Sequence, residues 1–474
     1  MPDQTTYRGA RPTGPGAPAR LDDEFARRLE ARRRRERALR RLTRRARRRR
    51  NSFFAVLLLV TAVVLGFGFS SRRPPAGPGG HPASRAPVAA ALPVIVPTAA
   101  LTGATAGRLP PIAFPKMGES AVAFGGSGVV AESARQRPVP IASLTKIMTA
   151  YLVLARHPLT GAEQGPTLRF SAADHEAWVV ASENGNSNVE INKGEVLTER
   201  QLLEALLIHS ADNVADILGR WVSGSDPAFV GLMNKTARAL GLSHTHYADD
   251  SGISPKSIST PADQAYLASV AMENPVFRQI VALPDVAFPV MGHIWSYNPA
   301  LGVDGIIGVK SGFTPQANGC LVTAAWHMVG GHKVLEVAAV TGQRFGLYQA
   351  AQVDEALMKA ASAHVHLVAP LGGRLGLARL RAAWARHGIT LSLRRPLLLA
   401  GWGGLDYRAR LVGSPLTRGE IGRGWAAGQV VATLELSNQF GPAASIPLVA
   451  SRPLAPPPKG TFAAPGGRRL RVGG

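Results

Sequence analysis

Residues 143–146 read SLTK, residues 210–213 read SADN, and residues 310–314 read KSGFT. Each stretch alone is common by chance, but the three follow one another within a region that has the composition of one folded domain. A serine with a lysine one helical turn later places a nucleophile beside a base. A second serine on a loop can relay a proton, and a Lys-Ser-Gly strand can line the opposite wall of a cleft. The three stretches together predict a site built around a serine nucleophile.

Hydrophobic spacing predicts where the first two stretches lie. Apolar residues recur through residues 144–155 at the three- and four-residue spacing of a helix packed into a core, with Ser143 at the N-terminal end of that helix. Thr198 and Gln201 have the spacing of a capping box, which would begin the helix that leads to Ser210.

Further helices and strands are predicted between these stretches and after them. An Asp-Pro pair begins a helix over residues 226–241 that ends at a glycine, and Thr260 caps another helix. Residues 321–326 and 334–340 are expected to be paired β-strands around the glycines at 330–331. Helices that flank a sheet predict an α/β domain.

The residues around the three stretches resemble those of the low-molecular-mass D-alanyl-D-alanine carboxypeptidases, a family of penicillin-binding serine peptidases with Ser-x-x-Lys and Lys-Thr-Gly motifs. The resemblance covers residues 113–452 and is most specific in its first two thirds. The segments that carry it are 141–150 (IASLTKIMTA), 202–209 (LLEALLIH), 303–305 (VDG), 427–436 (AGQVVATLEL) and 446–450 (IPLVA).

The resemblance implies a β-lactamase/transpeptidase-like catalytic domain, an antiparallel sheet flanked by helices, followed by a small β-rich C-terminal domain. It implies serine-type hydrolysis of peptidoglycan stem peptides that end in D-Ala-D-Ala, with β-lactam antibiotics as acylating inhibitors and without a metal or a cofactor. Ser143 would carry the acyl group, Lys146 would accept its proton as general base, and Ser210 would relay a proton to the departing D-alanine. The substrate-binding residues that it implies are Lys310, Ser311, Gly312, Phe313, Thr314, Asp212 and Asn213.

Two positions depart from the family pattern. The second motif is usually Ser-x-Asn, whereas this chain has Asp212 in the third place and Asn213 next. An amide can donate to a substrate carbonyl and accept from Lys146, whereas an ionised aspartate can only accept. Two interpretations stay open: Asn213 takes over after a small backbone shift, or Asp212 pairs with the cationic centre and alters its pH dependence. Ser311 stands where threonine is common, which keeps the hydroxyl group.

Positive charge is concentrated at the N-terminus. The formal net charge of the chain is +23, and residues 1–50 hold 18 Arg against 6 acidic residues. They lead into residues 53–69 (FFAVLLLVTAVVLGFGF), an uncharged stretch that would span about 26 Å as a helix. The positive-inside rule then places residues 1–52 in the cytoplasm and the catalytic domain on the cell-wall side of the cell membrane.

We therefore expect a single-pass N-terminal membrane anchor. A cleavable signal peptide is the rival interpretation, but the charged region is too long for one and no small-x-small site follows closely on the apolar run. An Arg-rich tail beside an apolar span is more often an orientation signal in contact with anionic lipid than a nucleic-acid site, so we expect no nucleic-acid partner.

Cys320 is the only cysteine, which excludes an intramolecular disulfide, and its apolar context predicts a buried core residue.

Composition divides the chain into six parts. The expected parts are a basic disordered tail (1–52), a transmembrane anchor (53–69), a Pro/Ala/Gly-rich stalk (70–112), the catalytic domain (113–360), the β-rich domain (361–452) and a disordered tail (453–474).

Four functions fit these patterns: a D,D-carboxypeptidase, a D,D-endopeptidase that cuts peptide cross-links, a β-lactamase, and a catalytically weak penicillin-binding or morphogenetic protein. A β-lactamase needs a glutamate-activated deacylating water, and no Glu-x-x-Leu-Asn type segment occurs between Ser210 and Lys310. The histidines and aspartates of residues 244–250 could suggest a metal site, but alternating polar residues after a helix are more often a loop. We expect the carboxypeptidase.

Overall fold

The computed structural model describes residues 93–98, 101–413, 415–416, 423–458, 468–469 and 471–472. The predictions of a basic tail and a membrane anchor concern residues 1–69, which lie outside the described residues. Within the described residues, no helix is long and apolar enough to cross a membrane.

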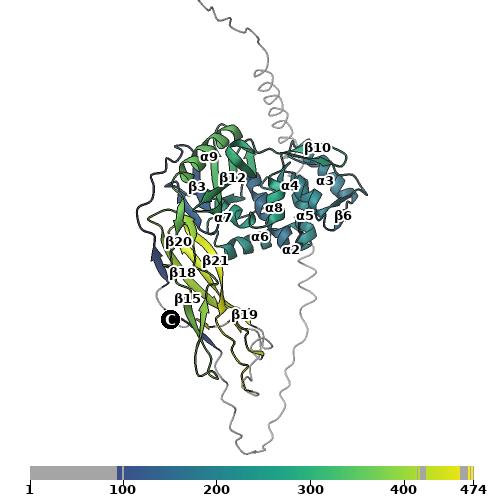
Figure 1. Cartoon of the computed structure of the whole chain (residues 1–474). Coiled ribbons are helices and arrows are strands. Elements are labelled where there is room, and N and C mark those ends of the chain that lie inside the picture. The colour runs from purple at the N-terminus through teal and green to yellow at the C-terminus, as the bar shows by residue number, and fades with distance from the viewer. Residues whose placement is uncertain are drawn as a thin grey trace, which may run out of the picture. The chain divides into compact units, whose positions relative to one another are not determined.

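The first lobe is built on a five-stranded antiparallel sheet with the strand order β11-β12-β13-β3-β4 (Figure 1). β12 and β13 pair across the glycines at 330–331, which confirms the predicted strand pair. The strands are β3 (Glu119–Phe124), β4 (Gly128–Glu132), β11 (Ile306–Thr314), β12 (Asn318–Val329) and β13 (His332–Gln343).

Both faces of this sheet are covered, because side chains alternate along a strand and both sets are apolar. In β3, Ala121 and Ala123 pack into the core formed with the helical part of the lobe. Val122 and Phe124 of the same strand pack on the opposite side, in the core that includes α9 (Leu347–Ser362). The sheet is therefore the middle layer of the lobe.

Helices before β11 form the rest of the lobe, and local signals in the sequence predict where they begin and end. α4 begins with the predicted capping box, in which the Thr198 and Gln201 side chains each accept from the other's backbone N–H. α6 ends at Gly241, whose φ of 77° suits a residue without a side chain. The helices are η1 (Ala142–Thr145), α2 (Lys146–Arg156), α3 (Ala172–Glu183), α4 (Glu199–Leu207), α5 (Asp212–Ser223), α6 (Asp226–Leu240), α7 (Pro261–Ala271), α8 (Pro275–Val281) and η2 (Val303–Gly305).

Short two-stranded ribbons connect these helices and the second lobe. They pair β5 (Val139–Pro140) with β8 (Ile258–Ser259), β6 (Thr167–Arg169) with β7 (Val196–Thr198), β9 (Asp285–Phe288) with β10 (Gly292–Trp295), β14 (His366–Val368) with β17 (Leu399–Gly401), and β19 (Pro415–Leu416) with β22 (Arg468–Arg469).

The second lobe is an eight-stranded sheet with its own apolar core, in the strand order β2-β18-β20-β21-β16-β15-β1-β23. Its strands are β1 (Val94–Pro97), β2 (Thr102–Ala104), β15 (Gly376–Arg381), β16 (Ile389–Ser392), β18 (Asp406–Gly413), β20 (Val430–Asn438), β21 (Gly441–Ala450) and β23 (Arg471–Val472).

Three strands at the ends of this sheet come from residues that the sequence analysis assigned to the stalk and to the C-terminal tail. Residues 94–97 and 102–104 were expected in a stalk, but β1 pairs with β15 and β2 pairs with β18. The reason is the apolar run around Ile95, whose side chain is buried in the core of the second lobe. Residues 471–472, expected in a disordered tail, pair with β1. The second lobe therefore contains strands that precede the first lobe in the sequence and strands that follow it.

Buried polar contacts join the two lobes. The Asn438 side-chain amide, at the end of β20, donates to the carbonyl oxygens of Ser127 at 3.2 Å and Val129 at 2.7 Å. Nearby, the Trp402 ring meets Phe124 edge to face with 6.1 Å between the ring centroids. The second lobe therefore packs directly against the β3–β4 edge of the five-stranded sheet.

Replacing Asn438 with alanine is expected to lower the free energy of unfolding by about 1–3 kcal/mol, because two buried carbonyl groups lose their donor. Chemical denaturation of the full-length protein, followed by tryptophan fluorescence, measures this change. Gln439→Ala is the matched control, since the Gln439 side chain makes its hydrogen bonds at the surface. Equal destabilisation by the two variants would contradict a buried contact between the lobes.

Candidate functional site

Ser143 and Lys146 meet at the junction of η1 and α2. Lys146 Nζ donates to Ser143 Oγ at 2.9 Å, as expected for residues one turn apart. Ser143 is half-buried, whereas the Lys146 side chain has no exposed surface. Ala142, directly before the serine, has a φ of 48°, a left-handed conformation that non-glycine residues rarely adopt. Such backbone strain is common at functional sites.

Lys146 uses all three of its N–H groups. Besides Ser143, it donates to Asp212 Oδ1 at 2.6 Å and to the carbonyl oxygen of Ser251 at 2.7 Å. An ammonium group has three donors and no acceptor, so this arrangement describes the protonated lysine with every donor satisfied. The amine becomes a base only after one of these protons has moved.

The contacts of Asp212 and Asn213 decide between the two interpretations left open by the sequence. Asp212 is buried and forms the ion pair with Lys146. Asn213 faces the backbone of Val189 instead: its Nδ2 donates to the Val189 carbonyl at 2.9 Å, and its Oδ1 accepts from the Val189 N–H at 3.2 Å. Both ends of the Asn213 amide are therefore engaged away from Ser143, and Asp212 is the side chain that faces the cationic centre.

Burial governs the protonation of Asp212. It raises the pKa of this carboxyl group, and the adjacent Lys146 ammonium offsets part of that rise. A carboxyl group in this position holds a proton more readily than one in water, which makes Asp212 a possible acceptor for the Lys146 proton.

Ser210 lies in the short connection between α4 and α5. It is buried and has a φ of 62°, so its backbone is also left-handed. The N–H of Ala211 donates to the carbonyl of Ala205 at 3.0 Å, and the N–H of Asp212 donates to the carbonyl of Ser187 at 2.8 Å. These two hydrogen bonds hold the two residues that directly follow Ser210.

Lys310 is the second buried lysine of the site, on the edge strand β11. Its Nζ donates to the carbonyl oxygen of Ser311 at 2.9 Å. Burial lowers the pKa of Lys310 well below its ordinary value, and the nearby Lys146 ammonium lowers it further. The two lysines therefore differ in environment, because only Lys146 has a carboxylate hydrogen-bonded to it.

Gly312 lets β11 approach Ser143 closely. A Cβ atom at this position would lie 2.9 Å from the Ser143 nitrogen and 3.0 Å from the Ile141 carbonyl oxygen, closer than side chains tolerate. The backbone of β11 thus lies against the peptide N–H groups at the start of η1. Next along the strand, the Phe313 side chain is exposed, and Thr314 Oγ1 accepts from the Ala317 N–H at 3.1 Å.

The loop before β8 also contributes to the site, which motif reasoning missed. The Ser251 carbonyl accepts from Lys146, and Gly252 lies so close to η1 that a Cβ atom would be 1.8 Å from the Ala142 carbonyl oxygen. Asp249 shapes this loop by accepting from the N–H groups of Gly252 at 3.1 Å and Ser254 at 2.9 Å. The Asp-Asp-Ser-Gly run at 249–252 was a turn signal that could have drawn attention to the loop.

The histidines near this loop do not gather around a metal. The His244 N–H and the Thr245 hydroxyl both bond to Asp263 Oδ2, at 2.9 and 2.7 Å. Among the residues that the structure describes, no three His, Cys, Asp or Glu side chains come together as a possible metal site.

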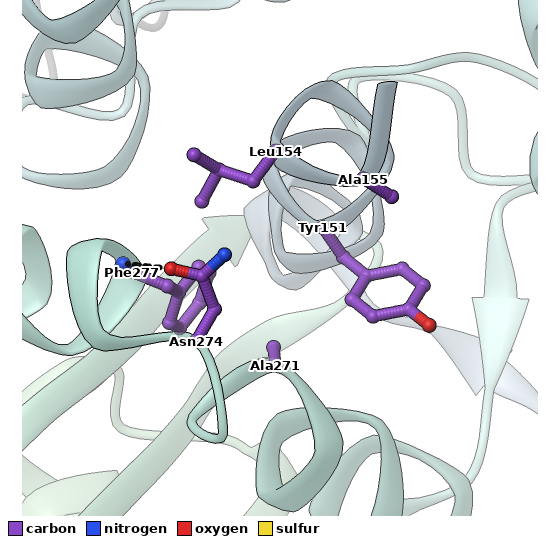
Figure 2. Close-up of a pocket in the computed structure, with 6 residues that line it drawn as sticks. All are labelled: Tyr151, Leu154, Ala155, Ala271, Asn274 and Phe277. Carbon is purple, nitrogen blue, oxygen red and sulfur yellow. Dashed lines mark hydrogen bonds between the residues drawn. The ribbon is translucent and has the colours of Figure 1, made fainter. Parts of the chain in front are cut away.

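A small pocket lies between α2 and the segment leading into α8 (Figure 2). Its volume of about 70 Å³ is far below the roughly 300–1,000 Å³ typical of ligand pockets. The lining residues are Tyr151, Leu154, Ala155, Ala271, Asn274 and Phe277, none of which belongs to the three motifs. We therefore do not assign the site to this pocket.

Comparisons with known proteins agree on one family. The family model described as D-alanyl-D-alanine carboxypeptidase matches residues 121–339. The D-alanyl-D-alanine carboxypeptidase of Streptomyces sp. strain K15 is 36% identical over 200 residues, which cover 39% of this chain and 67% of that protein. The D-alanyl-D-alanine endopeptidase of Pseudomonas aeruginosa is 29% identical over 195 residues, which cover 39% of this chain and 58% of that protein.

A solved structure shares the fold. Penicillin binding protein 5 from Haemophilus influenzae superposes with a TM-score of 0.53 at 18% identity, covering 74% of this chain and 100% of that chain. This likeness confirms the predicted α/β fold. In sequence, the chain spans about half to two thirds of the length of the curated relatives that it matches.

Replacing Lys310 with methionine is expected to stabilise the protein, because the change removes a cation from a buried position. Burial lowers the pKa of Lys310, so the unfolded chain binds a proton more readily between that lowered value and the ordinary 10.5. Lys310 therefore lowers the free energy of unfolding most at pH values near its lowered pKa. This loss of stability disappears as the pH rises toward 10.5.

Denaturation midpoints measured at about pH 6 and about pH 10 should show the larger gain for Lys310→Met at the lower pH. Lys193→Met, at an exposed position, serves as the matched control. A gain of equal size at both pH values would contradict the assignment of the cost to the buried charge.

Proposed function

Because this chain belongs to the D-alanyl-D-alanine carboxypeptidase family, we propose that it is a serine-type peptidase that removes the terminal D-alanine from peptidoglycan stem peptides. The observation that carries the proposal is the contact between Lys146 Nζ and Ser143 Oγ at 2.9 Å, opposite the close approach of Gly312. A nucleophile, a buried amine and a strand that can hold the substrate meet at one place.

The reaction begins with a proton transfer within the Lys146–Asp212 pair. Moving one ammonium proton to Asp212 Oδ1 across 2.6 Å leaves a neutral amine beside Ser143, and the raised pKa of Asp212 favours this step. The amine then takes the hydroxyl proton as Ser143 Oγ attacks the carbonyl carbon of the peptide bond. Backbone N–H groups at Ser143 and Phe313 would stabilise the oxyanion that forms.

Collapse of that intermediate breaks the carbon–nitrogen bond and leaves an acyl ester on Ser143. The departing D-alanine nitrogen receives its proton through Ser210, the buried serine of the α4–α5 connection. Water then attacks the ester, and the shortened stem peptide is released. A β-lactam ring would acylate the same serine and react with water slowly, since no glutamate-activated water is expected here.

Lys310 would recognise the carboxylate of the terminal D-alanine, together with the hydroxyl groups of Ser311 and Thr314. Burial disfavours the charged form of Lys310 in the free enzyme. An arriving carboxylate would favour the ammonium form, so substrate binding and protonation of Lys310 would be coupled.

A D,D-endopeptidase is the second candidate, because one relative carries that name at 29% identity. Both reactions use the same acyl-enzyme chemistry and differ in the group that leaves. The catalytic residues alone therefore do not separate them.

We further propose that residues 53–69 anchor the enzyme in the cell membrane, with the N-terminus in the cytoplasm. The support is the uncharged apolar run itself and the cluster of arginines before it. This orientation would place the catalytic lobe on the cell-wall side, where peptidoglycan lies.

Replacing Ser143 with alanine should abolish covalent labelling by a fluorescent penicillin and the release of D-alanine from a peptide that ends in D-Ala-D-Ala. The reason is that the acyl group would have no oxygen to bond to. Gel fluorescence and a D-alanine assay measure the two effects, with Ser182→Ala, an exposed serine on α3, as the control. Covalent labelling of the Ser143→Ala protein would contradict the assignment of Ser143 as the nucleophile.

Chromatography of digested peptidoglycan separates the two candidate reactions in the same preparation. A carboxypeptidase shortens monomeric pentapeptides to tetrapeptides, whereas an endopeptidase converts cross-linked dimers to monomers. Conversion of dimers alone would replace the first proposal with the second.

Protease added to intact protoplasts is expected to digest the catalytic lobe and to leave a protected fragment of about 70 residues, since the positive-inside rule keeps the basic tail in the cytoplasm. An antibody against the N-terminal tail detects this fragment. Mature protein that begins at or beyond residue 70, read by N-terminal sequencing, would show a cleaved signal peptide instead of an anchor.

A further inference from the structure

His209 directly precedes Ser210 and links the α4–α5 connection to another part of the lobe. The histidine is buried, and its Nε2 is 3.1 Å from the hydroxyl oxygen of Tyr297. The two rings are tilted against each other with 4.8 Å between their centroids. Trp295 meets the other side of the imidazole edge to face at 6.2 Å. Two aromatic side chains therefore hold the residue beside the proposed proton relay.

Backbone hydrogen bonds fasten the same two segments together. The N–H of Tyr297 donates to the carbonyl of Ile208 at 3.3 Å, one residue before His209. The N–H of Ser296 donates to the carbonyl of Pro284 at 2.8 Å, which ties the segment to the start of the β9–β10 ribbon. Residues 295–297 thus form a brace along the Ser210 turn, and we call these three residues the aromatic brace.

The surroundings of His209 favour the neutral imidazole. Burial lowers the pKa of His209, and the charge of Lys310 lowers it further, while the Trp295 backbone acts in the opposite sense. The other titratable group in contact with the ring is the Tyr297 hydroxyl, whose own pKa is raised by burial. Protonation would leave Nε2 able only to donate to the Tyr297 hydroxyl oxygen, whereas the neutral ring can also accept from it.

Ser210 needs such support because its backbone is left-handed without being glycine. A φ of 62° at a serine is strained and persists only where neighbouring contacts hold it. His209 is the residue directly before Ser210, and its side chain contacts both Tyr297 and Trp295. We propose that His209 is a positioning residue that, by its contact with Tyr297, fixes the Ser210 hydroxyl for proton transfer. This proposal rests on the proposed function.

The test compares four variants of the full-length protein: His209→Ala, His209→Gln, Tyr297→Phe and the control His293→Gln, an exposed histidine on β10. The measurements are the acylation rate with a fluorescent penicillin and the kcat and KM of D-alanine release from a diacetyl-Lys-D-Ala-D-Ala peptide, across acidic and neutral pH. Thermal melts verify that each variant is folded.

We expect His209→Ala to lower the acylation rate and kcat by about tenfold, with KM changed by less than about twofold, because a misplaced relay affects the reaction more than substrate binding. Tyr297→Phe should lower the same rates, because it removes the hydroxyl group that bonds to His209 and keeps the ring. His209→Gln should recover most of the activity, because its amide can still bond to Tyr297. The pH profiles of the wild-type protein and His209→Gln should also differ at acidic pH, because only the wild-type protein has a titrating imidazole at this position.

A folded His209→Ala protein that reacts within about twofold of the wild-type rate would overturn the positioning role. If that variant does not fold, an unchanged rate and pH profile in Tyr297→Phe overturns it equally. A wild-type protein that neither reacts with penicillin nor releases D-alanine would refute the proposed function, and the positioning role with it. Reactive wild-type protein with unaffected variants would remove the positioning role alone.

Discussion

One buried ammonium group holds the site together. Lys146 Nζ bonds to the Ser143 hydroxyl, the Asp212 carboxylate and the Ser251 carbonyl, which belong to η1, α5 and the loop before β8. A buried charge without partners would be very costly, so these three segments must lie where they do for the lysine to be tolerated. The same contacts place the amine 2.9 Å from Ser143 Oγ, the proposed nucleophile. The stability of this part of the lobe and its chemistry therefore depend on the same three hydrogen bonds.

The two buried lysines of the site, Lys146 and Lys310, have different neighbours. Asp212 compensates the charge of Lys146 directly, and burial gives that carboxyl group a raised pKa. Lys310 bonds only to a neighbouring carbonyl, and its pKa is lowered by burial and by Lys146. In the proposed reaction, the first lysine exchanges its proton with Asp212, whereas the second binds the carboxylate of the substrate. The two buried lysines thus differ in whether a carboxylate is hydrogen-bonded to them.

Close backbone approach makes this arrangement compact. Gly312 brings β11 against the Ser143 amide, and Gly252 brings the loop before β8 against Ala142. Ala142 and Ser210, one before and one within a serine-bearing motif, both have left-handed backbone, with φ of 48° and 62°. The five-stranded sheet is packed on both faces, and Asn438 of the second lobe bonds to Val129 of β4, at the edge opposite β11. The aromatic brace supports the Ser210 turn.

Local patterns in the sequence were enough to predict α2, the capping box of α4 and the β12–β13 pair, because each depends on spacings within one element or across one tight turn. The pairing of Ser143 with Lys146 followed in the same way from residues one helical turn apart. The sequence could not decide between Asp212 and Asn213, since the answer depends on contacts with Val189 and Lys146, which are distant along the chain. Nor could it reveal Ser251, which contributes a backbone carbonyl that any residue carries. The pairing of β1 and β2 with strands that follow the catalytic lobe was hidden for the same reason. Hydrogen bonds between distant segments are chosen by the packing of the whole chain, so only the tertiary structure decided them.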